Sequence, residues 1–278
     1  MAEPDRSRWK SGGLTVHHQP DFGPEAALRA VADYREAPRR EGVRFIKTDH
    51  TRTILTLPLR GAEGDRSGGE NPRVCVKHFR YCGFLYSLKD LLRSPRGRRS
   101  WRAGNSFISR GITTGRPLAL VEVKKRGLLR ESFLLMEDLS SFLGVHHYVL
   151  SNFNGASARG AEVRARFVEA LARTLSELHG TDLYHGDLKS SNILVEEAGE
   201  RWRFHYIDLD GVKMGGKVSL KGRAKNLAQI ETSTPDCITG ENRCLFFRHY
   251  LRYVDMEIDE KTFLDMISRH TVRRTRVW

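Results

Sequence analysis

One polar segment of the chain gathers residue types that can do chemistry at close spacing. Residues 185–195 read His-Gly-Asp-Leu-Lys-Ser-Ser-Asn-Ile-Leu-Val, so that Asp187, Lys189 and Asn192 fall within six positions. Sixteen residues after Asn192, a second carboxylate, Asp208, follows the apolar residues of an expected strand. A carboxylate in such a loop can orient an attacking hydroxyl group and accept its proton, which is the role we assign to Asp187.

This combination is what phosphoryl transfer from ATP requires. The transferred group passes through a loose transition state, so positioning and charge neutralisation do most of the work. Magnesium prefers oxygen ligands and keeps several waters, so Asn192 and Asp208 suffice as its protein ligands. Asp210 lies two residues further on and is an alternative to Asp208. We prefer Asp208 because the apolar strand ends directly before it.

Two lysines supply the positive charge that the phosphates need. Lys77 lies in an alternating segment, Val-Cys-Val-Lys at 74–77, and would bind the α- and β-phosphates. Lys189 would act near the γ-phosphate. A lone strand lysine is more often a solvated side chain, but the ordered set of motifs is much harder to obtain by accident.

The elements that must position these residues change in character along the chain. Residues 1–22 are polar and without pattern, which indicates a loose arm. A strand-rich part follows and includes two helices with proline in the first turn. Helices are predicted at 24–37 and 95–110, and strands at 42–48, 51–57, 74–79, 117–123 and 131–136. Residues 61–72 are rich in glycine and predict an exposed turn.

After a connector at 136–139 the chain becomes mostly helical. Residues 162–179 carry apolar side chains at intervals of three and four, which is the signature of an amphipathic helix. A short apolar run follows at 193–195, a strand is predicted at 202–207, and residues 222–270 have helical character. The fold class is therefore α+β.

Composition narrows the possible partners and compartment. The 278 residues carry a formal net charge of +13, with 39% hydrophobic and 9% aromatic residues, which argues against disorder. Polar side chains interrupt the longest charge-free run, 139–158, and no apolar stretch follows a basic start, so we expect a cytoplasmic protein without a membrane span. The four cysteines have no zinc-like spacing and receive no role. The charge favours a polyanionic partner.

Four motifs resemble the protein-kinase-like superfamily and, within it, the lipopolysaccharide core kinases of the Kdo/WaaP type. They are His-Gly-Asp-Leu at 185–188, Asn-Ile-Leu at 192–194, Ile-Asp-Leu at 207–209 and Arg-Gly-Ile-Thr-Thr-Gly-Arg-Pro-Leu-Ala at 110–119. The resemblance covers residues 43–251. It implies a bilobal kinase-like fold: an arm at 1–22, a small antiparallel-sheet lobe that binds ATP at 23–137, and a helical lobe with the catalytic loop at 138–278.

The resemblance also implies an activity. This is ATP- and magnesium-dependent phosphorylation of a sugar hydroxyl in the lipopolysaccharide inner core, on Kdo or heptose, at the cytoplasmic face of the inner membrane. Backbone groups of Glu137 and Leu139 would bind adenine, and the acceptor would be an anionic glycolipid at an anionic membrane surface, with no nucleic acid. Candidate acceptor contacts are Arg96, Arg98, Arg99, Arg102, Lys213, Lys217, Lys221 and Arg223.

Three features depart from the superfamily pattern. The helix at 95–110 contains no Asp or Glu to pair with Lys77, so Glu122 or the phosphates alone would have to hold that lysine. The hairpin at 47–52 has no glycine, which leaves its backbone N–H groups or Arg52 to hold phosphate. No Ala-Pro-Glu triplet follows Asp208, and this favours an acceptor that is not a protein.

These departures keep other interpretations open. One is an atypical protein kinase or a kinase of small metabolites. Another is a catalytically weak, kinase-like binding module, for which the acid-free helix would mark lost catalysis. A nucleic-acid binder would depend on charge alone. The retention of Lys77, Asp187, Asn192 and Asp208 together weighs against the binding module.

Overall fold

The computed structural model describes residues 7–59, 72–81, 94–154, 160–199 and 201–272. The chain divides into two compact units. The first is drawn from Met1–Asn105 and Gly115–Ser141, and the second from Ser106–Thr114 and Phe142–Trp278. The glycine-rich segment predicted as a turn at 61–72 lies almost wholly outside the described residues.

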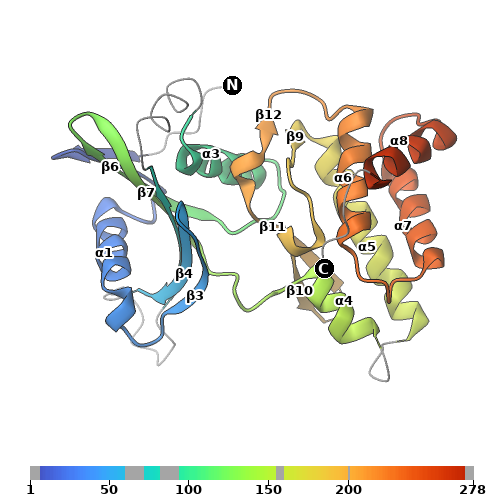
Figure 1. The fold of residues 1–278 in the computed structure, drawn as a ribbon, viewed down its shortest axis with the longest axis horizontal. Coiled ribbons are helices and arrows are strands. Elements are labelled where there is room, and N and C mark those ends of the chain that lie inside the picture. The colour runs from blue at the N-terminus through green and yellow to red at the C-terminus, as the bar shows by residue number, and fades with distance from the viewer. Residues whose placement is uncertain (1–6, 60–71, 82–93, 155–159, 200, 273–278) are drawn as a thin grey trace. The chain divides into compact units, whose positions relative to one another are not determined.

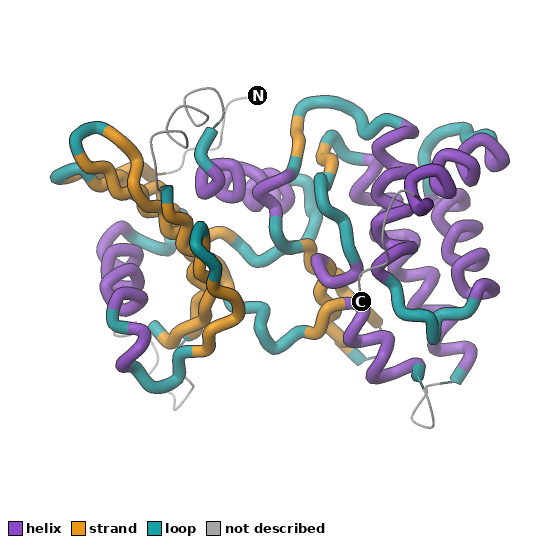
Figure 2. Tube along the Cα trace, viewed as in Figure 1, coloured by secondary structure: helices purple, strands orange, loops and turns teal. Residues whose placement is uncertain are grey.

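The first unit contains a seven-stranded antiparallel sheet (Figures 1 and 2). Its strands follow the order β1-β2-β6-β7-β5-β4-β3. Strands β5 and β6 are buried along most of their length and carry runs of apolar and β-branched residues, which favour strands that are covered on both faces. Their bounds are β1 Ser7–Ser11, β2 Leu14–His18, β3 Arg44–Thr48, β4 Arg52–Pro58, β5 Arg73–Arg80, β6 Pro117–Lys125 and β7 Leu128–Glu137.

Each face of this sheet has its own core. Helix α1, Pro24–Arg35, packs Ala27, Ala30 and Val31 against one face, and the short 3₁₀ helix η1, Ala37–Arg39, follows it. Helix α3, Arg96–Ser109, places Trp101 in a second cluster with Phe79, Tyr81, Leu120 and Leu134. Side chains alternate along a strand, so one set of residues faces each helix.

The prediction of a loose arm at 1–22 was wrong for residues 7–18. They form β1 and β2, and β2 pairs with β6 along Leu14–His18. Val16 is completely buried in the core with α1. The segment was overlooked because its alternation covers only a few residues and includes two histidines, which contribute little hydrophobic signal.

The second unit is mostly helical, as expected (Figure 2). Its described residues form five longer helices and two small sheets. The helices are α4 Val145–Phe153, α5 Ala161–Gly180, α6 Leu220–Ser233, α7 Gly240–Tyr253 and α8 Glu260–Val272. The short elements are β8 Leu143–Gly144, β9 Leu183–Tyr184, η3 Ser190–Asn192, β10 Ile193–Ala198, β11 Arg201–Tyr206, η4 Leu209–Gly211 and β12 Lys213–Met214.

Helix α5 is the amphipathic helix predicted at 162–179, and it buries Phe167, Leu171, Leu175 and Leu178 along one stripe. Helix α4 was not predicted, because two histidines and an asparagine break its apolar pattern. Helix α6 is unusual, since it buries Arg223, Asn226 and Gln229 together with its apolar residues. A helix with buried polar groups must find hydrogen-bond partners for them.

Candidate active site

The loop between β9 and β10 holds three of the predicted site residues in contact. Lys189 Nζ lies 3.0 Å from Asp187 Oδ2, and both side chains are 43% exposed. Asn192 Nδ2 donates to the backbone oxygen of Asp187 at 2.8 Å and lies 3.4 Å from its carboxylate. The carboxylate of Asp187 is therefore accessible to an acceptor while its backbone is held by the amide of Asn192.

The second carboxylate is brought to this loop by strand pairing. Strands β10 and β11 pair antiparallel, with Ile193 opposite Tyr206, and Ile207 N donates to Asn192 O at 2.9 Å. Asp208 follows directly and has φ 61° and ψ 52°, in the left-handed region. This conformation is uncommon for a residue other than glycine, and such strain concentrates at functional sites.

His185 connects the two segments from within the core. It is completely buried, and burial lowers the pKa of its imidazole. Its Nδ1 accepts from Asp187 N at 3.3 Å, so the proton of the neutral ring lies on Nε2 and is donated to Ile207 O at 3.0 Å. The neutral histidine thus fixes the loop of Asp187 against the strand that ends at Asp208.

Gly186 is required by a close approach of two backbones. A Cβ atom at this position would lie 2.6 Å from the backbone oxygen of Gly211, just after Asp208 in the chain. Contacts under about 3 Å force a shift when the partner is backbone. The His-Gly-Asp order of the motif therefore has a steric reason in addition to its chemical one.

The donor set of this site fits magnesium. The amide nitrogen of Asn192 faces Asp187, which directs its oxygen elsewhere, and the carboxylates of Asp208 and Asp210 follow shortly after the backbone contact between Ile207 and Asn192. Within the described ranges, no three His, Cys, Asp or Glu side chains cluster as a metal site on their own. An amide and one or two carboxylates suit a cation that keeps waters and phosphate oxygens as its other ligands. Asp208 and Asp210 are both half-buried, and the choice of Asp208 stays a prediction.

Lys77, Glu137 and Leu139 lie in the first unit and form a separate group of candidates. Lys77 is on β5 opposite Leu134, and it is 4% exposed. Its Nζ lies 5.4 Å from the centre of the Phe79 ring. A lysine this buried is not a solvated strand residue, because the charged form needs compensation in the interior.

Glu122 lies on the same face of the sheet as Lys77, but Arg98 binds it. Glu122 is opposite Ser132, which is opposite Phe79, two positions from Lys77 along β5. Both of its oxygens accept from Arg98 of α3, each at 2.7 Å, and Glu122 is fully buried. In the superfamily pattern this helix supplies an acid. In this protein α3 supplies Arg98, and strand β6 supplies the acid, Glu122.

Glu137 and Leu139 stay predicted adenine contacts. Glu137 ends β7, and its side chain accepts from the backbone N–H of Arg116 at 3.1 Å and from its guanidinium at 3.2 Å. Leu139 is half-buried and lies against Gly115. The side chain of Glu137 is thus held at the surface by Arg116, whereas the proposed contact with adenine involves the backbone.

The turn between β3 and β4 contains no glycine and is instead held by hydrogen bonds to the side chain of Asp49. Asp49 accepts from Thr51 N at 2.9 Å, Thr51 Oγ1 at 2.8 Å and Arg52 N at 2.9 Å. These hydrogen bonds hold the pKa of the Asp49 carboxyl well below its usual range. Arg52 Nε lies 3.3 Å from the same carboxylate, so its guanidinium takes part in the turn.

The predicted acceptor contacts divide into buried and exposed side chains. Arg223 is 6% exposed and donates to Val218 O, His179 O and Tyr250 Oη, so its prediction as an acceptor contact was wrong. The guanidinium of Arg98 is bound to Glu122. Those exposed in the second unit are Lys213, Lys217 and Lys221.

Several residues that hold the site were not singled out from the sequence. Thr113 donates to Phe204 O, and Thr114 Oγ1 donates to Tyr206 O at 2.6 Å, which joins the segment before β6 to β11. Asn226 and Gln229 of α6 bind the backbone of the catalytic loop. Polar residues at a spacing of three inside an otherwise apolar helix face were the available signal.

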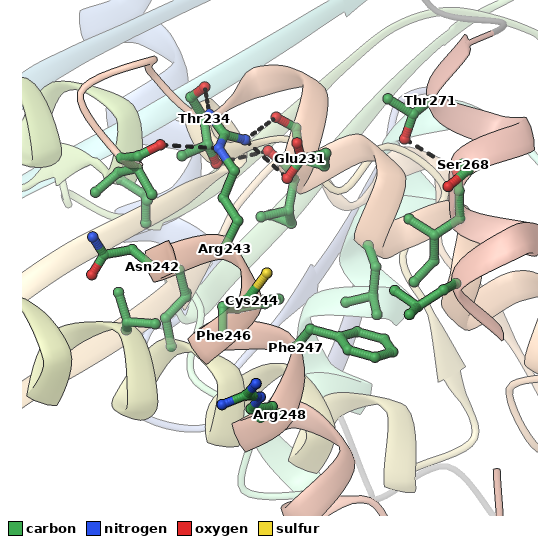
Figure 3. Close-up of a pocket in the computed structure, with 18 of the residues that line it drawn as sticks. Glu231, Thr234, Asn242, Arg243, Cys244, Phe246, Phe247, Arg248, Ser268 and Thr271 are labelled. Atoms are coloured by element: carbon green, nitrogen blue, oxygen red, sulfur yellow. Dashed lines mark hydrogen bonds and ion pairs between the residues drawn. The ribbon is translucent and has the colours of Figure 1, made fainter. Parts of the chain in front are cut away.

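A large apolar cavity in the second unit contains none of the predicted site residues (Figure 3). Its volume is about 520 Å³, and its lining comes from the helices, with Arg243 and Glu231 at its polar edge. Cavities of this kind are a default hypothesis for binding sites. The residues predicted to carry the chemistry lie in the loop around Asp187, so the cavity is not the candidate active site.

The fold matches that of a solved structure. The structure described as "WaaP in complex with acyl carrier protein" aligns with a TM-score of 0.63 over 90% of this chain and 96% of that chain, at 18% identity. A likeness at this identity shows the fold alone. The molecule therefore shares the fold of that structure.

The sequence comparisons specify the family. The profile of the lipopolysaccharide kinase (Kdo/WaaP) family matches residues 85–250, more than half of the sequence, and the chain belongs to this family. It is 31% identical over 130 residues to the 3-deoxy-D-manno-octulosonic acid kinase of Xylella fastidiosa (strain 9a5c). That alignment covers 47% of this chain and 46% of the relative, so the chain matches about half of the length of that protein.

Among the described residues, no helix combines the length and the apolar character needed to cross a bilayer.

Proposed function

We propose that this protein is an ATP- and magnesium-dependent kinase that phosphorylates a sugar hydroxyl of the lipopolysaccharide inner core. The observation that carries the proposal is the arrangement of Asp187, Lys189 and Asn192 beside the left-handed Asp208. Membership of the Kdo/WaaP family supports the reaction class. The phosphoryl donor and the metal follow from the chemistry that these side chains can support.

Each residue has a role in this proposal. Asp187 orients the sugar hydroxyl and accepts its proton, since its carboxylate is exposed and its backbone is fixed. Lys189, 3.0 Å from that carboxylate, would neutralise charge that develops on the transferred phosphoryl group. Asn192 and Asp208 would hold magnesium, which supplies charge neutralisation for the phosphates when it is bound.

The first unit would bind the nucleotide. Lys77 on β5 supplies a buried positive charge for the α- and β-phosphates, and the backbone at Glu137 and Leu139 would bind adenine. The sheet lobe is then the ATP-binding domain and the helical lobe the catalytic domain. The roles divide between Met1–Ser141, apart from Ser106–Thr114, and the remainder of the chain.

We infer that the acceptor sugar is Kdo in preference to heptose. The relative with 31% identity is a kinase of 3-deoxy-D-manno-octulosonic acid, which supports this choice. The net charge of +13 and the exposed lysines at 213, 217 and 221 support an anionic glycolipid as acceptor and a peripheral position on an anionic membrane surface.

Transfer of labelled γ-phosphate from ATP tests this proposal. Purified protein would be incubated with magnesium and one of three acceptors: a Kdo-containing inner-core glycolipid, the same lipid without Kdo, or a mixed protein substrate. Label in the first acceptor alone is expected. Label in the mixed protein alone would instead establish an atypical protein kinase, and equal label with and without Kdo would remove Kdo as the acceptor.

A further inference from the structure

Helix α6 presents a polar face to the loop that carries Asp187. Asn226 is completely buried and Gln229 is 2% exposed, although both lie in the interior of a helix. Buried amides of this kind cost stability unless every polar atom finds a partner. Their partners include backbone atoms of the loop that carries Asp187.

Three backbone groups around Asp187 are bound by these two amides. Asn226 Nδ2 donates to His185 O at 2.8 Å, and Gln229 Nε2 donates to Gly186 O at 3.3 Å. On the other side of Asp187, Leu188 N donates to Gln229 Oε1 at 3.1 Å. Gln229 therefore spans Asp187, with one bond to the residue before it and one to the residue after it.

The two amides belong to a longer chain of hydrogen bonds with a defined direction. Arg223 Nη1 lies 3.4 Å from Tyr250 Oη, and Tyr250 Oη lies 2.9 Å from His179 Nδ1. His179 Nε2 lies 3.1 Å from Asn226 Oδ1, and Asn226 Nδ2 donates to Gln229 Oε1 at 2.7 Å. Since Asn226 Oδ1 can only accept, His179 carries its proton on Nε2 and accepts from Tyr250 at Nδ1.

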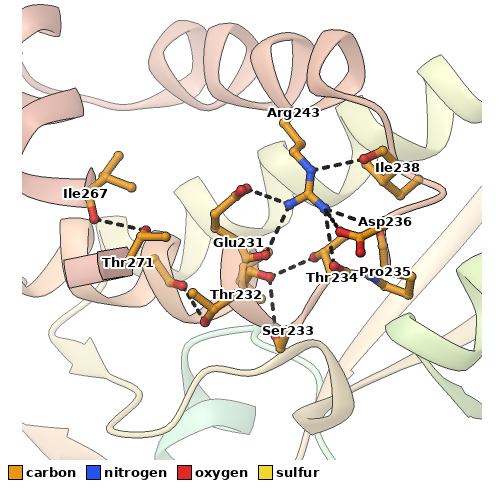
Figure 4. A network of polar contacts seen from close by, with 12 residues as sticks. Glu231, Thr232, Ser233, Thr234, Pro235, Asp236, Ile238, Arg243, Ile267 and Thr271 are labelled. Atoms are coloured by element: carbon orange, nitrogen blue, oxygen red, sulfur yellow. Dashed lines mark hydrogen bonds and ion pairs between the residues drawn. The ribbon is translucent and has the colours of Figure 1, made fainter. Parts of the chain in front are cut away.

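Each side chain in this series of hydrogen bonds is thus oriented by the next one. His179 is neutral, because burial lowers its pKa to about 3. Helix α6 is itself anchored at its C-terminal end by Arg243, which binds Glu231, Thr234 and Ile238 (Figure 4). The loop of Asp187 is therefore attached to a helix that is fixed from both sides.

We propose that Gln229, oriented by Asn226, is a positioning residue for phosphoryl transfer that holds the backbone on both sides of Asp187 in the productive geometry. The inference depends on the role of Asp187 under the proposed function. It adds a residue that touches neither nucleotide nor acceptor. A small misplacement of a catalytic group is enough to lower turnover strongly while binding is retained.

The variant Gln229→Met tests this role, because methionine is of similar length and removes both hydrogen bonds to the loop. The matched control is Thr232→Val on the same helix, whose buried hydroxyl donates to the backbone oxygens of Ala228 and Gln229 within α6 and has no hydrogen bond to the loop. We expect Gln229→Met to lower kcat by about tenfold or more, with little change in the KM for ATP. Thr232→Val should leave both constants close to those of the unchanged protein. Equal kcat values for the two variants, per folded molecule, would overturn the proposal.

Hydrogen exchange of the unchanged protein gives a second test that does not need the variant to fold. The amide of Leu188 should be protected, since it donates to a buried acceptor in a loop. Rapid exchange at Leu188 would contradict the proposal whatever the activity. If instead Asp187→Asn kept full turnover, the assignment of the base would fail, and this outcome is distinct from any result at Gln229.

Discussion

At the scale of single residues, backbone geometry constrains the candidate site as strongly as side-chain chemistry does. Asp208 has a left-handed backbone, and Gly186 lies so close to Gly211 that no side chain fits between them. Both features lie within the hydrogen-bonded pair of segments that His185 joins. The candidate site is therefore built on two adjacent backbone segments, one carrying Asp187 and the other carrying Asp208.

The steric requirement at Gly186 gives a prediction. Gly186→Ala would place a Cβ atom 2.6 Å from Gly211 O, so one of the two backbones must move. We expect a loss of about 1–3 kcal/mol in the free energy of unfolding, together with a large loss of turnover. Denaturant unfolding and initial rates measure the two effects. Gly180→Ala is the control, because its Cβ would have no atom within 4 Å. Equal stability of the two variants would show that the close approach is not required.

At the scale of elements, α3 shows how the sheet lobe is held together. The ion pair of Arg98 with the fully buried Glu122 joins the helix to β6. In the superfamily pattern the helix supplies the acid and the sheet supplies the base. Here the helix supplies the base, Arg98, and the sheet supplies the acid, Glu122. This arrangement leaves Glu122 engaged and explains how α3 can lack acidic residues and still be fixed to the sheet.

Removal of the guanidinium should therefore destabilise the first unit. Arg98→Met leaves the carboxylate of Glu122 buried without its two donors. Breaking a buried pair costs about 3–5 kcal/mol, and we expect about 2 kcal/mol because Arg98 is one-third exposed. Chemical denaturation of Arg98→Met, with Arg102→Met on the exposed face of the same helix as the control, would measure it. A loss no larger than that of the control would show that the pair does not stabilise the lobe.

At the scale of the whole molecule, the order of elements was predictable and several of the contacts were not. Helix α5 was predicted because burial of one face imposes a period on its sequence, and β5 was predicted from its short apolar, β-branched run. Strands β1 and β2 were missed because short segments with histidine carry little of that signal. The loop at 185–192 was singled out as the candidate catalytic loop because His-Gly-Asp and Asn192 keep a fixed spacing, and this role stays a prediction.

Other contacts of the site could not have been read from the sequence, because they depend on tertiary partners. Arg223 becomes buried, and α6 forms hydrogen bonds with the loop that carries Asp187, only when α5, α6 and α7 pack together. The pairing of Arg98 with Glu122 likewise joins residues 24 positions apart on a helix and a strand. Sequence patterns identify residue types, whereas these assignments need the register of packed elements.

In our proposal, Asp187 acts as the base in magnesium-dependent phosphoryl transfer. The most direct test compares the unchanged protein with Asp187→Asn, by measuring transfer of labelled γ-phosphate to a Kdo-containing glycolipid and binding of ATP in the same preparations. We expect turnover to be lost in Asp187→Asn while ATP binding persists, because the lysine and backbone groups proposed to bind the nucleotide lie in the other unit. Full turnover of Asp187→Asn would contradict the assignment of Asp187 as the base.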